Sequence, residues 1–333
     1  MRRLLFALLL LLAVNLIFSQ FGNFEQFANV IGNGQPVWIG MAFVVQIGWL
    51  INQTAEYRAL YRVVGLKEGL QNLLPLVLAS NTANIAAPTG GASGIAVLVD
   101  NARGRGLSTA RVTLAGVLYI VFDYITFCFV LVLGLIVLSR RDELDTAEAI
   151  ASVIMFGAAI GLGAVFLLGL RSAAALERAL VMTARAVNSV IRPILRRNYL
   201  SEETAHLFAT EAAEGLLTLR EQPGGRRLLP IALSLNNHAY QITILFLVFL
   251  AFNQPFSPGT IIAVFSMAYL FTIVSPTPMG IGVVEGLMTL TLRSVGVPLE
   301  AATVITLAFR GFVLWLPVLY GFLALQIKGL SRR

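Results

Sequence analysis

Two apolar stretches of this chain, residues 70–103 and 259–293, are each interrupted in the middle by proline and glycine. The first interruption reads PTGGASG from Pro88 to Gly94, and the second reads PTPMGIG from Pro276 to Gly282. Proline and glycine break a helix, and non-helical backbone inside a membrane is tolerated only against protein or a water-filled cavity. Each stretch is therefore predicted to form a hairpin of two half-helices that enters and leaves the membrane on one side.

The composition of the chain is that of a membrane protein. Of its 333 residues 57% are hydrophobic and 12% are charged, and the mean hydropathy is +0.82. These values exclude a soluble enzyme. The net charge of +7 does not indicate nucleic-acid binding, because the basic residues flank apolar segments, as residues that orient membrane helices do. The single cysteine, Cys128, excludes a disulfide framework within the chain.

Six further stretches are long and apolar enough to cross roughly 30 Å of hydrocarbon. They lie near residues 4–20, 37–53, 110–138, 149–170, 229–252 and 299–325. The first resembles a secretory signal but lacks a small-x-small cleavage site, so we expect an uncleaved helix. The predicted fold is an all-α polytopic membrane protein with six full transmembrane helices and two broken re-entrant hairpins.

The distribution of lysine and arginine predicts the orientation of these segments. With both termini in the cytoplasm, Arg140, Arg141 and Arg293 are the only basic residues left outside, and the two hairpins enter from opposite sides. The chain then forms a single membrane domain with two inverted repeats, 37–138 and 229–325, in the cytoplasmic (inner) membrane. Such repeats with broken helices at matching positions are typical of transporters with a site near the membrane midplane.

The segment 171–227 between the repeats is rich in arginine, with Arg171, Arg178, Arg185 and Arg192 spaced seven residues apart. It is predicted to be a basic amphipathic helix. The helix either lies on the inner leaflet, attracted to anionic head groups, or is an ordinary solvated helix of a cytoplasmic loop.

Three charged residues fall inside apolar segments, where a charge is costly and therefore indicates a functional site. Arg310 is predicted to bind a lipid phosphate with its guanidinium, or alternatively to form a structural ion pair with Glu285 or Asp123. Glu285 lies three residues after Gly282, where it can cap the returning half-helix and face a cavity. Asp123 aligns with the neighbourhood of Arg310 in the other repeat, which predicts two polar points beside one cavity.

The breaks themselves are candidate phosphate sites, because the start of a half-helix presents backbone N–H groups and a positive dipole end. Pro88, Pro276 and Pro278 interrupt the helices, and Gly90, Gly91, Gly280 and Gly282 permit close approach. The alternative is a packing kink filled by protein side chains. Asn84, Asn237 and His238 are predicted to line a hydrophilic groove, although such residues also join helices by hydrogen bonds.

The residues of the second half resemble a known family. The run Pro276-Thr-Pro278-Met-Gly280-Ile-Gly282-Val-Val-Glu285, followed by Gly296, Ala308-Phe-Arg310, Trp315, Pro317 and Gly321, is similar to the membrane domain of lysylphosphatidylglycerol synthases and of stand-alone flippase-like members. The resemblance covers essentially the whole chain and implies movement of a phospholipid or lipid-phosphate across the bilayer. It differs at the first break, where many members carry an arginine and a glutamate and this chain is uncharged from Pro88 to Val99, so their head-group preference does not carry over.

The resemblance implies a lipid transporter rather than an enzyme. No synthase domain is expected, because only a short basic tail follows Leu325. Expected partners are membrane phospholipids, including anionic ones, and we predict no catalytic residue, metal or cofactor. Alternatives are a carrier of another amphiphilic or ionic solute, a membrane scaffold for a lipid-modifying partner, or a protease resembling the rhomboids, with Ser93 and His238 as its reactive pair.

Overall fold

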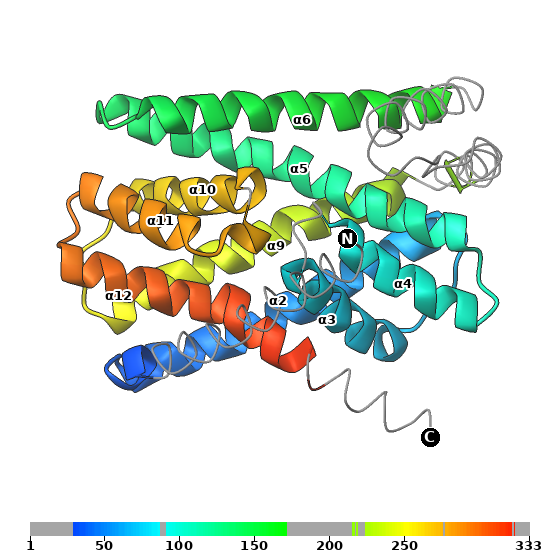
Figure 1. Ribbon diagram of the computed structural model, residues 1–333, viewed down its shortest axis with the longest axis horizontal. Coiled ribbons are helices and arrows are strands. Elements are labelled where there is room, and N and C mark those ends of the chain that lie inside the picture. Colours follow the sequence, from blue (N-terminus) through cyan, green and yellow to red (C-terminus); the bar gives the residue numbers. More distant parts are fainter. Residues whose placement is uncertain are drawn as a thin grey trace, which may run out of the picture.

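The computed structural model describes residues 29–86, 91–171, 215–216, 218, 224–275, 277–321 and 323, and nearly all of them lie in helices (Figure 1). The helices are α2 (Pro36–Val63), α3 (Leu70–Ala86), α4 (Ala92–Gly104), α5 (Thr109–Arg140), α6 (Thr146–Arg171), α9 (Gly224–Ala251), α10 (Pro258–Val274), α11 (Val283–Ser294) and α12 (Leu299–Arg310), with a 3-10 turn at Pro278–Gly280 and a π-helical turn at Gly311–Trp315. This part of the chain contains no strand. The predicted all-α class is confirmed.

Five helices are long and apolar enough to cross a membrane, namely α2, α5, α6, α9 and α12 with its continuation to Gly321. They coincide with five of the six predicted transmembrane segments. The sixth, residues 4–20, lies outside the described residues, as does most of the basic segment 171–227. The helix that contains the second predicted span, residues 37–53, continues to Val63.

The two interrupted stretches form the predicted broken hairpins. Helix α3 is followed by α4 after the first break, and α10 by α11 after the second. In Figure 1 the α10–α11 hairpin comes from the left end of the molecule and the α3–α4 hairpin from the right end, so that the ends of α3 and α10 lie towards the centre. Helices α2 and α9, which precede the hairpins, run in opposite directions along the long axis.

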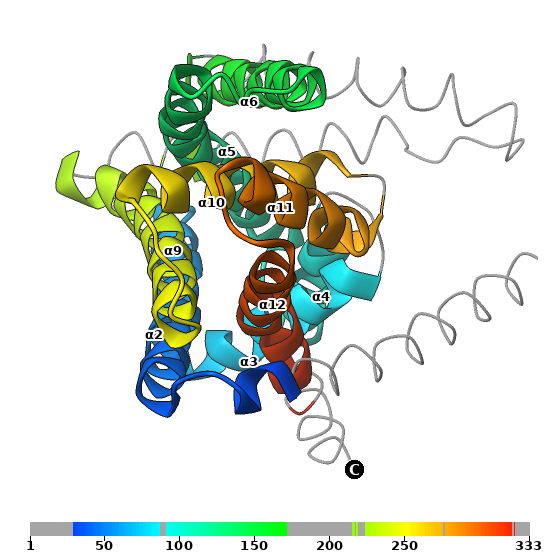
Figure 2. The ribbon, with the colours of Figure 1, turned by 90° about the vertical axis from the view of Figure 1, so that its left-hand side faces the viewer.

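The same pairs of helices pack together in the two halves. Each hairpin packs on itself, on the helix before it (α3 on α2, α10 on α9) and on the helix after it (α4 on α5, α11 on α12). Helix α2 lies along α9 and joins the halves (Figure 2). Each hairpin has its own apolar core, one centred on residues such as Leu73 and Leu118 and the other on Phe265 and Met288.

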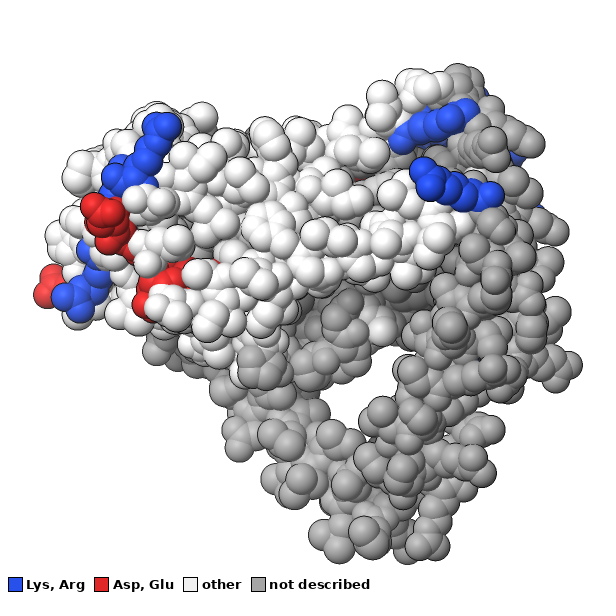
Figure 3. Space-filling model, turned by 90° about the horizontal axis from the view of Figure 1, so that it is seen from above, with Lys and Arg blue, Asp and Glu red and all other residues white. Residues whose placement is uncertain are grey.

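The outer surface carries a wide uncharged band. Charged residues gather at the two ends of the long axis, and uncharged residues cover the middle of the face over α5 and α6 (Figure 3). On α6 the apolar side chains of Ile150, Val153 and Ile160 are 58%, 71% and 71% exposed. Apolar side chains in such numbers are stable on a surface that contacts lipid, so the long axis is the direction across the membrane.

Candidate functional site

A cavity of about 170 Å³ lies at the level where the two hairpins break. Its wall includes Asn84 and Ile85 at the end of α3, Met279 in the second break, and side chains of α2, α5, α9, α10 and α12. The polar groups that line it are Gln53, Asn81, Asn84, Tyr119, Asp123, Asn237, Gln241, Tyr269, Thr272 and Arg310. The cavity has room for water molecules or a small polar group.

Arg310 contributes the guanidinium in the cavity wall, and its side chain is only 3% exposed. Its Nε donates to Glu285 Oε1 at 2.8 Å, and its Nη2 donates to the backbone carbonyl of Met279 at 2.9 Å. These two bonds attach the last turn of α12 to the second break. Nη1 makes no hydrogen bond to any described residue. One amino group of the guanidinium is therefore left for a group that enters the cavity.

A π-helical turn begins directly after Arg310. The N–H of Leu316 donates to the carbonyl of Gly311, five residues earlier. The next residue, Pro317, has no N–H to donate, which favours a change in the hydrogen-bond pattern at this place. Such turns insert one residue into a helix and are often found at functional sites.

The second break has an unusual backbone. Met279, Gly280 and Gly282 have positive φ angles of 50°, 70° and 83°. A Cβ on Gly280 would collide with the Val284 side chain and lie 3.1 Å from Thr272 Cα, so only glycine fits there. Left-handed backbone costs a non-glycine residue about 1–2 kcal/mol. Met279 has this conformation, and its carbonyl accepts a hydrogen bond from Arg310.

Glu285 stabilises both the break and the arginine. Its Oε1 accepts from Arg310, and its Oε2 accepts the N–H of Gly282 at 2.7 Å, which caps α11. The ion pair and the cap foreseen for this residue are thus both formed. The N–H of Gly280 also bonds within the break, to Thr277 O. In this conformation the amides of Gly280 and Gly282 are bonded within the break, whereas Arg310 lines the cavity.

The first break is capped by a neutral side chain. Asn84 Oδ1 accepts the N–H of Gly94 at 2.7 Å and the hydroxyl of Ser93 at 3.1 Å. Gly94 aligns in sequence with Gly282 of the other hairpin, but Gly94 is the third residue of α4 and Gly282 precedes α11. The first half-helix is thus capped by the neutral Asn84 and the second by the charged Glu285. Gly91 precedes α4 with a φ of 96°. The candidates Pro88, Gly90 and Pro276 lie outside the described residues, and Pro278 starts the 3-10 turn.

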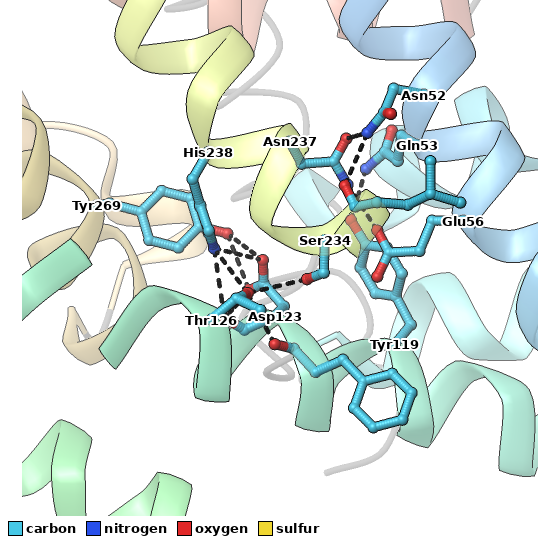
Figure 4. A network of polar contacts seen from close by, with 12 residues as sticks. Asn52, Gln53, Glu56, Tyr119, Asp123, Thr126, Ser234, Asn237, His238 and Tyr269 are labelled. Atoms are coloured by element: carbon cyan, nitrogen blue, oxygen red, sulfur yellow. Dashed lines mark hydrogen bonds and ion pairs between the residues drawn. The ribbon is translucent and has the colours of Figure 1, made fainter. Parts of the chain in front are cut away.

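Asp123 lies in α5 and forms the second polar point of the cavity wall (Figure 4). The Tyr269 hydroxyl is 2.9 Å from both of its carboxylate oxygens, and His238 Nε2 is 3.6 Å from Oδ1. His238 Nε2 is also 3.2 Å from the Thr126 hydroxyl, whereas its Nδ1 has no partner among the described residues. Asp123 and Arg310, predicted as two polar points beside one cavity, both line this cavity, and the alternative ion pair between them is not formed because Arg310 is paired with Glu285.

A row of amides joins α2 to α9 beside the cavity. Asn52 donates to Asn237 Oδ1 at 2.6 Å, and Asn237 donates to Glu56 Oε2 at 2.6 Å. Gln53 donates to the Tyr119 hydroxyl at 2.9 Å. Asn237 lines the cavity as well, so it has both roles considered for it: a cavity residue and a link between helices. Of these residues Glu56 is fully buried.

Sequence reasoning missed Glu56, Tyr269 and Tyr119. Glu56 follows Asn52 by four residues and Gln53 by three, which places all three on neighbouring positions of one helix. That signal was hidden because the predicted span ended at residue 53. The tyrosines carry no such signal, since an aromatic residue in an apolar run is ordinary core.

The proposed reactive pair of a protease is not assembled at the cavity. Ser93 starts α4 and bonds to Asn84 of α3, whereas His238 of α9 faces Asp123 and Thr126 of α5. Within the described ranges no group of three or more His, Cys, Asp or Glu side chains is placed to hold a metal ion.

Fold and site together define a polytopic all-α membrane protein with a polar cavity between two broken helical hairpins. Residues 3–321 match the family described as the lysylphosphatidylglycerol synthase TM region, and the chain belongs to that family. This region is the membrane part of the synthases and not their catalytic part. The chain is also similar to a UPF0104 membrane protein of Methanocaldococcus jannaschii, with 23% identity over 311 residues, 91% of this chain and 88% of that protein. The family resemblance of the second break is confirmed.

Proposed function

We propose that the protein moves a phospholipid or a related lipid-phosphate across the cytoplasmic membrane, with the head group passing through the central cavity. Both termini lie in the cytoplasm in this proposal, and no covalent reaction takes place. Its membrane fold and its family support a transport role. The acyl chains stay in the bilayer, and the cavity accommodates the polar head group.

The proposal rests on the burial and hydrogen bonding of the Arg310 guanidinium. A guanidinium buried near the middle of a membrane needs compensation, and Glu285 with the Met279 carbonyl supplies it for Nε and Nη2. Arg310 lines the cavity, and its Nη1 has no bond to a described residue. A phosphate oxygen is a strong acceptor for such a donor, and charge-assisted bonds of this kind are about twice as strong as neutral ones.

The arrangement of the helices supports movement by alternating access. Two hairpins that enter from opposite ends border one cavity, and helix pairs of the first half recur in the second. We interpret 37–138 and 229–325 as inverted repeats that rock against each other around this cavity, as in other transporters built from such repeats. The cavity would then open to one side of the membrane at a time.

The test is exchange of reporter phospholipids across vesicles that contain the purified protein. We expect wild type to accelerate exchange and Arg310→Ala to lower the rate by about tenfold or more, since a bond to a charged group contributes about 1.5–3 kcal/mol. The matched control is Arg293→Ala, which removes an exposed arginine at the end of α11.

The outcomes separate the proposal from its competitors. If both variants exchange lipid at the wild-type rate while remaining folded, Arg310 does not bind the head group. If wild type exchanges no reporter with any head group, lipid movement is not the function, and a solute carrier or a scaffold for a lipid-modifying partner is favoured instead.

A further inference from the structure

Two buried carboxylates lie next to the cavity without a matching number of cations. Glu56 is 0% exposed, and the side chain of Asp123 is 14% exposed. Arg310 is paired with Glu285, which leaves His238 as the one basic group bonded within this cluster of described residues. Even a charged His238 balances only one carboxylate. An uncompensated carboxylate costs several kcal/mol in such a place, so the cluster must hold at least one further proton.

The hydrogen bonds indicate which carboxyl group holds that proton. Asp123 receives the Tyr269 hydroxyl and lies beside His238, so it is surrounded as an anion requires. The Asn237 amide donates to Glu56 Oε2 and the Ser234 hydroxyl lies beside this carboxyl group; both partners are neutral, and Oε1 has no hydrogen-bond partner among the described residues. The titratable neighbours of Glu56 are Tyr57 on its own helix and Tyr119 and Asp123 on α5, whereas α9 contributes the neutral Asn237 and Ser234 and α3 has no titratable side chain.

Polar groups connect Glu56 to the cavity. Ser234 of α9 lies beside Glu56, and its hydroxyl is 3.0 Å from that of Thr126. Thr126 is 3.2 Å from His238 Nε2, which is 3.6 Å from Asp123 in the cavity wall. This series of hydroxyl, imidazole and carboxylate groups is a short path along which a proton can pass (Figure 4).

We propose that Glu56 is a proton-binding residue that couples lipid movement to a proton gradient; this inference rests on the proposed function. The proton leaves the Glu56 carboxyl group as the Ser234 hydroxyl accepts it and passes its own proton to Thr126. Thr126 passes one to His238, and His238 passes one to Asp123 and then to water in the cavity. The hydroxyl groups are unchanged at the end, while Glu56 has lost one proton and one water has gained it.

The experiment measures lipid exchange and lumenal pH together in vesicles containing the full chain, with and without an imposed pH gradient. We expect the gradient to accelerate exchange by wild type and exchange to carry protons. In Glu56→Gln we expect the rate of lipid exchange with the pH gradient to equal the rate without it. The change of lumenal pH that accompanies exchange should disappear. The matched control is Glu148→Gln, which changes another buried glutamate, hydrogen-bonded to Thr291 at the far end of the molecule.

Each result decides between the two proposals. If the wild-type rate of lipid exchange does not change with the pH gradient, or changes with a sodium gradient instead, Glu56 does not have the proposed role. The proposal of lipid transport is then unaffected. A wild-type gradient response that persists in Glu56→Gln also overturns the role of Glu56. No exchange under any condition contradicts the proposed function and, with it, this inference.

Unmodified protein provides a second readout if Glu56→Gln does not fold. A hydrophobic carbodiimide adds to a protonated carboxyl group inside a membrane, and mass spectrometry identifies the modified residue. We expect Glu56 to be modified and exchange to lose its gradient response in proportion. A protein that is never modified at Glu56, or that keeps its response after full modification, contradicts the proposal.

Discussion

At the scale of single residues, Glu285 is the link between the cavity and the second break. One carboxylate oxygen accepts from Arg310 and the other caps α11 through Gly282. Arg310 is nearly inaccessible, while the side chain of Glu285 is 23% exposed. Loss of the ion pair is therefore more costly for Arg310, whose charge is buried, than for Glu285, whose carboxylate is in part accessible to water.

This inequality predicts the stability of variants. Glu285→Gln leaves the guanidinium buried without its counter-charge, which costs about 3–5 kcal/mol for a broken buried pair. Adding Arg310→Met removes the unpaired charge and should recover part of the loss, as a double-mutant cycle of melting temperatures in detergent measures. Glu300→Gln, at an exposed position in the first turn of α12, is the control. A double variant no more stable than Glu285→Gln would show that the pair does not hold the break.

The charged residues could be predicted from the sequence, but their pairing could not. Arg310, Glu285 and Asp123 stand out because charges in apolar segments are costly. Whether Arg310 pairs with Glu285 or with Asp123 depends on the path of the chain through the break, including the left-handed backbone of Met279. Glu56 escaped notice because its helix extends beyond its apolar part.

At the scale of elements, the hairpins depend on how closely their backbones turn. Gly280 and Gly282 both have positive φ angles, but they differ in their surroundings. A Cβ at Gly280 meets Val284 and the α10 backbone, whereas a Cβ at Gly282 meets nothing within 4 Å. The first position is constrained by conformation and by space, the second by conformation alone.

Alanine substitutions at these two glycines should therefore have unequal effects. Gly282→Ala should cost about 1–3 kcal/mol, because a φ of 83° with a ψ of −41° is a conformation that residues with a Cβ rarely adopt. Gly280→Ala should cost more and should also lower lipid exchange, because displacing the break moves the carbonyl that holds Arg310. Melting temperatures and exchange rates of the two variants test this. Equal effects in both measurements would contradict the described geometry of the break.

The order and type of the elements could be predicted because proline and glycine mark both breaks in long apolar runs. Helix ends were less accessible to sequence reasoning. Helix α2 extends past its apolar part because α9 and α5 bury its polar residues, as Asn52 and Gln53 show. The π-helical turn after Arg310 depends on packing as well as on Pro317, and the sequence pattern did not indicate it.

At the scale of the whole molecule, the two halves enclose one polar cavity inside an apolar exterior. The uncharged band of the surface lies between charged ends, and the cavity lies where the hairpins from both ends meet (Figures 1 and 3). A head group that crosses the membrane through this protein must pass this point in the proposed mechanism. The rest of the molecule then contributes the apolar walls and the two repeats that move.

Reversible blocking of the cavity tests this account most directly. In a Cys128→Ser background, Thr272→Cys places a thiol in the cavity wall, and Thr303→Cys places one at an exposed position of α12 as a control. Reporter phospholipid exchange is measured before modification with a small charged thiol reagent, after it, and after reduction. We predict that modification stops exchange at Thr272→Cys alone and that reduction restores it. Exchange that continues at full rate with the cavity thiol completely modified would contradict passage of the head group through the cavity.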